Sequence, residues 1–168
     1  MKKFKLLFLI IFLGSITQQI RSQSMLANIS DPSLDFTLVS LKGDSIRLSS
    51  MKGKVFLLDF WASWCIPCRA SNKQLVNLYD KYRDKGFEIL GVSLDENIKD
   101  WKRAIIKDKI SWLQVIDTNG WDAVAALKWN IEAIPSSFLI DQLGNVVAIN
   151  PDKEKLESIV RTLTNLKK

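Results

Sequence analysis

The clearest pattern along the chain is a series of short, almost uninterrupted runs of apolar residues. Three of them lie at 55–60, 87–93 and 112–116. These runs lack the alternation of a strand with one wet face, so we expect strands that are buried on both faces of a sheet. Two shorter apolar runs, 137–140 and 146–149, flank Gly144-Asn145 and predict a hairpin.

Between these runs, apolar residues recur every three or four positions, which is the spacing of one face of an α-helix. The helical sets are Leu75, Leu78, Tyr79 and Tyr82, closed by Gly86; Ile98, Trp101 and Ile105; residues 121–129; and Leu156, Ile159, Val160 and Leu163. Residues 36–39 and 46–48, on either side of Gly43, predict an N-terminal β-hairpin. Strands that alternate with helices predict an α/β domain with a mixed central sheet flanked by helices.

The first 24 residues have a different character. Basic residues at Lys2, Lys3 and Lys5 precede an apolar run at 6–13, which is too short to span a bilayer comfortably. A basic segment followed by a short apolar one is typical of a secretory signal peptide. We therefore expect residues 1–24 to be a signal peptide or an uncleaved N-terminal membrane anchor, with a buried core helix as the remaining alternative. Residues 25–168 are then one exported domain.

Composition excludes several kinds of site. The chain has 168 residues, a net charge of +6, no histidine and two cysteines. Four basic residues and no acid lie in residues 1–24, so the rest is close to neutral, and we expect no nucleic-acid partner. With only two cysteines and no histidine, the chain alone cannot supply an ordinary tetrahedral zinc site, and without histidine it has no Ser-His or Cys-His pair. We expect neither a metal nor an organic cofactor.

The two cysteines, Cys65 and Cys68, carry the candidate chemistry. Only Ile66 and Pro67 separate them, so a disulfide between them closes too small a loop to add much stability, which favours a redox role. Because the pair follows a buried strand and precedes a helix, Cys65 is predicted at a helix N-terminus, where a thiolate is stabilised. Cys68, one turn further on, can then attack a mixed disulfide formed on Cys65.

Asp59 is the one charged residue in the apolar run that leads to the cysteines. Burial raises the pKa of a carboxyl group because it disfavours the charged form. Such a group can take the proton of Cys68 when that thiol must attack, and later return it. The alternative is that Asp59 lies near the end of its strand and reaches solvent.

The segment 59–68, Asp-Phe-Trp-Ala-Ser-Trp-Cys-Ile-Pro-Cys, resembles the active-site stretch of the thioredoxin superfamily. Segments 48–54, 91–95 and 134–141 are similar to those of exported TlpA/ResA-like disulfide reductases, and the resemblance spans roughly residues 33–165. It implies a thioredoxin-like fold with a helix inserted near Trp101. It also implies a cis peptide bond before Pro135, next to the cysteines, and an Ile134 backbone that pairs with an extended substrate.

The same resemblance indicates a substrate-binding set made of Trp64, Ile66, Pro67, Ile134 and Pro135. Many exported relatives carry Asn at the strand position of Asp59 and Glu at the helix position of Ser71, so the acid is relocated in this chain. The remaining tryptophans are expected to pack in the core or against the inserted segment; they are Trp101, Trp112, Trp121 and Trp129. Asp95 and Glu96 are expected to start a helix rather than to bind metal.

The predicted function is an exported thiol-disulfide oxidoreductase at the periplasmic or extracytoplasmic face. A reductase of protein disulfides is favoured because no histidine separates the cysteines to stabilise the thiolate. Its partners would be disulfide-bearing proteins, apo-cytochrome c among those that the resemblance implies, and a membrane thiol electron donor. Membrane contact is expected only through an uncleaved N-terminal segment. The alternatives are a disulfide-forming oxidase, a thiol peroxidase and a non-catalytic binding module.

Overall fold

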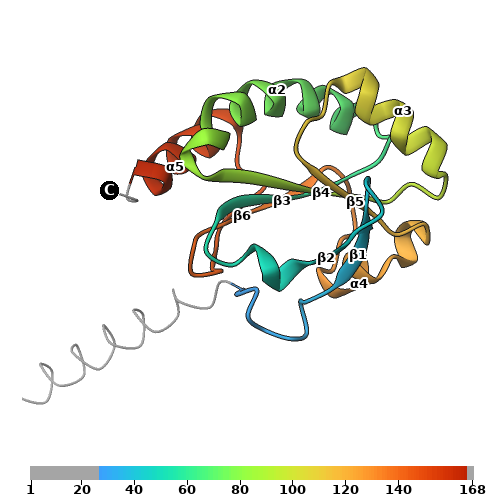
Figure 1. Cartoon of the computed structure of the whole chain (residues 1–168), viewed down its shortest axis with the longest axis horizontal. Coiled ribbons are helices and arrows are strands. Elements are labelled where there is room, and N and C mark those ends of the chain that lie inside the picture. The colour runs from blue at the N-terminus through green and yellow to red at the C-terminus, as the bar shows by residue number, and fades with distance from the viewer. Residues whose placement is uncertain (1–26, 166–168) are drawn as a thin grey trace, which may run out of the picture.

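The computed structural model describes residues 27–165, which build one mixed β-sheet with helices on both faces (Figure 1). Its strands are β1 (Thr37–Ser40), β2 (Ser45–Arg47), β3 (Val55–Trp61), β4 (Phe87–Ser93), β5 (Leu113–Ile116), β6 (Ser136–Ile140) and β7 (Val146–Ile149). They lie in the order β2-β1-β5-β4-β3-β6-β7. The central strands β3, β4 and β5 are parallel, and all the other pairings are antiparallel.

The helices divide between the two faces of the sheet (Figure 1). They are α2 (Ile66–Tyr82), α3 (Ile98–Asp108), α4 (Val124–Lys128) and α5 (Lys153–Asn165). Helices α2, α3 and α5 share one apolar cluster with one face of the sheet, and α4 and the 3₁₀ turn Leu48–Met51 share the cluster on the other. The sheet therefore separates two cores, and the side-chain alternation of each strand decides which core a residue enters.

Strand β3 shows this alternation most clearly. Leu57 and Trp61 belong to the core beneath α2, whereas Leu58 and Phe60 belong to the opposite core. Because side chains two residues apart share a face, Asp59 also points toward α2. The strand thus carries one carboxyl group into an otherwise apolar layer.

Most of the predicted elements are confirmed, including the N-terminal hairpin, the mixed sheet and the inserted helix α3 between β4 and β5. The prediction of one helix over 121–129 is wrong. The segment forms a 3₁₀ turn, Gly120–Asp122, and then the short α4, because Ala123 between them is extended. Asp117 supports this break by accepting a hydrogen bond from the first backbone N–H of α4 (2.9 Å).

The predicted signal peptide or anchor, residues 1–24, lies outside the described residues. Within residues 27–165, none of the helices has the length and the apolar character needed to cross a membrane. No group of three or more histidine, cysteine or acidic side chains gathers as a possible metal site in that part of the chain.

Candidate active site

The two cysteines lie where β3 ends and α2 begins, and they form a disulfide with their Cα atoms 5.3 Å apart. Cys65 is the N-cap of α2, and its Sγ accepts a hydrogen bond from the backbone N–H of Cys68 (3.2 Å). Both cysteines are buried, whereas Ile66 between them is 83% exposed. The pair thus lies just beneath a surface that a partner can reach.

The position of Cys65 favours a negative charge on its sulfur once the disulfide is reduced. The backbone N–H groups of the first helical turn have no partner within the helix, and the helix dipole is positive at that end. Pro67 contributes no N–H and fixes the backbone of the first turn. The local structure therefore stabilises a thiolate on Cys65 rather than on Cys68, which is one turn inside the helix.

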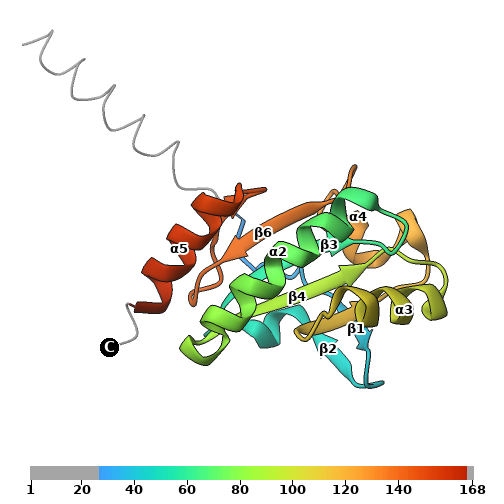
Figure 2. The same cartoon turned by 90° about the horizontal axis from the view of Figure 1, so that it is seen from above.

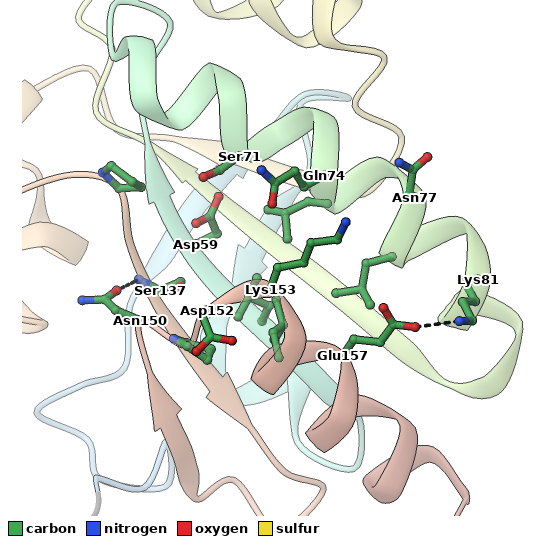
Figure 3. Close-up of a pocket in the computed structure, with 16 residues that line it drawn as sticks. Asp59, Ser71, Gln74, Asn77, Lys81, Ser137, Asn150, Asp152, Lys153 and Glu157 are labelled. Carbon is green, nitrogen blue, oxygen red and sulfur yellow. Dashed lines mark hydrogen bonds and ion pairs between the residues drawn. The ribbon is translucent and has the colours of Figure 1, made fainter.

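Asp59 lies beneath the same helix and is only 5% exposed. Its carboxyl group makes no side-chain hydrogen bond among residues 27–165, and burial raises the pKa of Asp59 to about 7. Figure 3 shows this carboxyl pointing toward the hydroxyl of Ser71 on α2. A carboxyl group with such a pKa exchanges its proton near neutral pH.

A cavity of about 470 Å³ connects Asp59 with the surface between α2 and α5 (Figure 3). Its lining includes the buried Asp59, the exposed Pro135 and an ion pair between Lys81 and Glu157 (2.6 Å). Lys153, at the start of α5, extends across the space between them. A polar cavity of this size can hold water beside Asp59, so the buried carboxyl has a route for proton exchange.

The peptide bond between Ile134 and Pro135 is cis, as predicted. Strand β6 starts directly after it and pairs with β3, where Ser136 lies opposite Phe60. This register places the cis-proline segment beside the end of β3 from which the cysteine loop emerges. Pro135 is exposed and Ile134 is partly buried.

Two carboxylates hold the loop that carries Cys65. Asp95, which follows β4 and is buried, accepts hydrogen bonds from the backbone N–H (2.9 Å) and hydroxyl (2.5 Å) of Ser63, and from the hydroxyl of Ser93 (2.7 Å). Asp108 of α3 accepts two hydrogen bonds from Arg69, whose guanidinium also donates to the carbonyl of Ser63 (3.1 Å). The loop is therefore anchored to both β4 and α3.

The environment of Asp108 shows how strong the second anchor is. Burial acts to raise the pKa of Asp108, but hydrogen bonds from Arg69 and Asn72 outweigh it and hold the pKa below its usual value. The carboxylate is thus charged at neutral pH and paired with a charge, as a buried ionised group must be. Helix α3, which connects β4 to β5, ties the first turn of α2 in place.

Comparison with known proteins places the chain in a family. The Redoxin family model matches residues 28–166. The chain belongs to the Redoxin family. The thiol-disulfide oxidoreductase ResA of Bacillus cereus is 30% identical over 175 residues, which cover 98% of this chain and 99% of ResA. ResA of Geobacillus kaustophilus is 35% identical over 133 residues, which cover 79% of this chain and 75% of that protein.

Solved structures agree. The thioredoxin domain of a thiol-disulfide oxidoreductase from Bacteroides vulgatus superposes with a TM-score of 0.72 at 36% identity, covering 78% of this chain and 94% of that one. A thiol-disulfide oxidoreductase from Bacteroides fragilis superposes with a TM-score of 0.71 at 34% identity, covering 77% of this chain and 96% of that one. The predicted thioredoxin-like fold and the TlpA/ResA-like resemblance are confirmed. With its Cys65–Cys68 pair, this Redoxin-family protein is a thiol-disulfide oxidoreductase.

Two features of this oxidoreductase depart from the expectations. Asp95 does not start a helix, because α3 begins later and is capped by Asn97; Asp95 anchors the cysteine loop instead. Trp121 is not in the core with Trp101, Trp112 and Trp129: it is 46% exposed, and its ring lies 6.2 Å from that of Trp64, which is 54% exposed. Trp64 precedes α2 directly, and Trp121 lies in the 3₁₀ turn before α4. Figure 2 shows the start of α2 and α4 at the same end of the sheet.

Asp95→Ala is expected to destabilise the Redoxin domain by about 2 kcal/mol and to slow disulfide reduction. The substitution leaves the buried hydroxyl of Ser93 and the N–H of Ser63 without their acceptor and frees the cysteine loop. Urea denaturation of the oxidised protein measures the first effect. Asp84→Ala, at a side chain that is 91% exposed, is the matched control, and equal midpoints for the two variants would contradict the anchoring role.

Proposed function

We propose that this oxidoreductase is an exported reductase of protein disulfides, in which Cys65 attacks the substrate, Cys68 releases it and Asp59 accepts and returns the proton of Cys68. The observation that carries the proposal is the placement of three groups around the start of α2. Cys65 caps the helix, Cys68 is buried one turn inside it, and Asp59 lies beneath it with a pKa raised to about 7.

The reaction starts from the reduced pair. The thiolate of Cys65 attacks one sulfur of the substrate disulfide, and the other substrate sulfur leaves as a thiolate that takes a proton from water. Cys68 then gives its proton to the carboxylate of Asp59 and attacks Cys65. The mixed disulfide breaks, the second substrate sulfur leaves as a thiolate that takes the proton back from Asp59, and the Cys65–Cys68 disulfide remains. Two electrons have passed to the substrate, so an external dithiol donor must reduce the pair again.

Substrate binding is assigned to the surface around this pair. Trp64, Ile66 and Pro67 border the cysteines on the helix side, and the Ile134–Pro135 segment borders them on the β6 side. An extended substrate segment between the two borders would offer its backbone to Ile134 and its disulfide to Cys65. The exposed indole of Trp64 suits an apolar side chain of that segment.

The reducing direction and the exported location rest on the sequence. Ile66 and Pro67 between the cysteines supply no cation that would make the pair a strong oxidant. The basic and apolar residues of the first 24 positions support export to the periplasmic or extracytoplasmic side, where a membrane thiol donor would supply the electrons. Apo-cytochrome c, during cytochrome c maturation, is the substrate class that the resemblance to exported TlpA/ResA-like reductases implies.

The reduction potential of the Cys65–Cys68 pair tests the direction. We expect a value near or below about −220 mV, in the range of thioredoxin and glutaredoxins, when the protein is equilibrated with defined thiol buffers and the thiols are counted. A potential near about −120 mV is that of a strong oxidant and would make the protein a disulfide-forming enzyme instead.

A further inference from the structure

A row of three residues crosses the sheet beneath α2. Asp59 on β3 lies opposite Gly91 on β4, and Gly91 lies opposite Gln114 on β5. All three positions point into the core beneath α2, because Leu57, Ile89 and Trp112, two residues away from them, belong to that core. The row therefore places a buried amide on the same face as the proposed proton acceptor, with only a glycine between them.

Gly91 makes room for this amide. A Cβ atom at position 91 would lie 2.1 Å from Nε2 of Gln114 and 2.7 Å from its Oε1, so the carboxamide occupies the space that any other side chain would fill. The carboxamide thus lies over β4, about one strand spacing of 4.8 Å from the strand that carries Asp59.

The orientation of the carboxamide is fixed by Trp61. The indole Nε1–H of Trp61 donates to Oε1 of Gln114 (2.9 Å), so the oxygen is engaged and the NH₂ group is left for another acceptor. Gln114 is 2% exposed, and its Nε2 is buried without a partner among residues 27–165. An unpartnered buried amide costs stability, so a residue of this kind calls for an explanation.

We propose that Gln114 is a positioning residue whose Nε2–H group donates a hydrogen bond to the carboxylate of Asp59 when Asp59 is ionised in the reduced protein. The proposal rests on the role of Asp59 in the proposed function. While Asp59 is protonated it carries no charge to stabilise, and the donor is left unpaired. In the reduced form the carboxylate that must take the proton of Cys68 gains a partner that stabilises its charge. The Gln114 amide thereby sets the pH at which Asp59 can act.

The other charges around Asp59 do not replace this donor. On the α2 side lie the thiol of Cys68 and Lys81, and Lys81 is already paired with Glu157 of α5. The cavity is completed by Asp152 and Lys153, both exposed, and β4 contributes only Gly91 at this level. Neutral donors also line the cavity, namely Ser137 of β6, directly opposite Asp59, and Ser71 and Gln74 of α2. Gln114 differs from them because it approaches from β4, on the side that the cavity does not reach, and its Nε2 is buried without a partner among residues 27–165.

The test is a titration of the Asp59 carboxyl carbon by NMR in the reduced protein, which needs no substrate. Gln114→Met, which keeps the length of the side chain and removes its N–H donor, is expected to raise the Asp59 midpoint by about one pH unit. Gln114→Leu should raise the Asp59 midpoint similarly, and it replaces the Met variant in the experiment if that variant is poorly folded. Gln142→Met, at an amide near the end of α5, is the matched control and should leave the midpoint unchanged.

A kinetic experiment separates this proposal from the proposed function. The rate at which Cys68 resolves a mixed disulfide should fall about tenfold in Gln114→Met below the midpoint, and the same substitution should have no effect in an Asp59→Asn background. An unchanged Asp59 midpoint in both Gln114 variants overturns the role of Gln114 and leaves the function standing. A shifted midpoint with an unchanged resolution rate supports the hydrogen bond and instead contradicts Asp59 as the proton acceptor.

Discussion

Replacing Cys65 with serine is expected to reduce the rate of protein-disulfide reduction by about 10³-fold or more. A serine hydroxyl at the N-cap of α2 is not ionised near neutral pH, so the first nucleophilic attack is lost even though the helix keeps a good cap. The measurement is the release of thiols from a protein disulfide, with a chemical dithiol as the electron donor. Ala70→Ser, which adds a hydroxyl at an exposed position of the same helix, should keep its activity.

The Cys68→Ser variant gives the complementary result. It retains the attacking thiolate and lacks the resolving thiol, so it should accumulate a covalent mixed disulfide with its substrate, visible by mass spectrometry under non-reducing conditions. The exposed fractions support this assignment, because Cys68, within α2, is 1% exposed and Cys65, at the N-cap, is 5% exposed. Equal trapping by Cys65→Ser and Cys68→Ser would contradict the order of attack.

Much of this fold can be predicted from the sequence because local patterns determine it. The segment 87–93 is mostly apolar, with Glu88 as its one charge, since its strand lies between two parallel neighbours and is covered on both faces. Gly86 ends the preceding helical segment in a left-handed conformation (φ 89°), which favours glycine. The two cysteines are recognisable for the same reason, as strand, loop and helix follow one another directly along the chain.

The parts of the site that sequence reasoning missed depend on contacts between distant segments. Asp95 and Ser63 are hydrogen-bonded although they lie 32 residues apart in the sequence. No local pattern around either residue predicts this contact. Trp121 is a large apolar residue of the kind expected in a core. It lies instead in the 3₁₀ turn before the break at Ala123, where its ring packs near that of Trp64. A weak signal existed for Asp95, because an acid close to the end of a buried strand needs a hydrogen-bond partner once it is itself buried.

Asp59→Asn is expected to stabilise the oxidised protein more and more as the pH rises from 4 to 8. The carboxyl has a pKa of about 7 in the folded state and 3.8 as its ordinary value, so between these values the folded protein binds the extra proton. Stability of the natural protein then falls with increasing pH, because the charge must form in a buried site. The two pKa values differ by about three pH units, which corresponds to about 4 kcal/mol in the free energy of unfolding. The stabilisation of Asp59→Asn relative to the natural protein should reach this full value above pH 7 and vanish below pH 4.

Urea unfolding of the disulfide form at several pH values measures this difference, because no thiol titrates in that form. Asp59→Ala removes the same titrating carboxyl but changes the packing around position 59 differently. Its plot of unfolding free energy against pH should therefore run parallel to that of Asp59→Asn, displaced by a constant amount. Lowered carboxyl pKa values, such as that of Asp108, act in the opposite direction and cancel when each variant is compared with the natural protein at the same pH. A difference that does not change with pH in either variant would mean that Asp59 is already ionised in the folded protein, and it would remove the proton acceptor from the proposed mechanism.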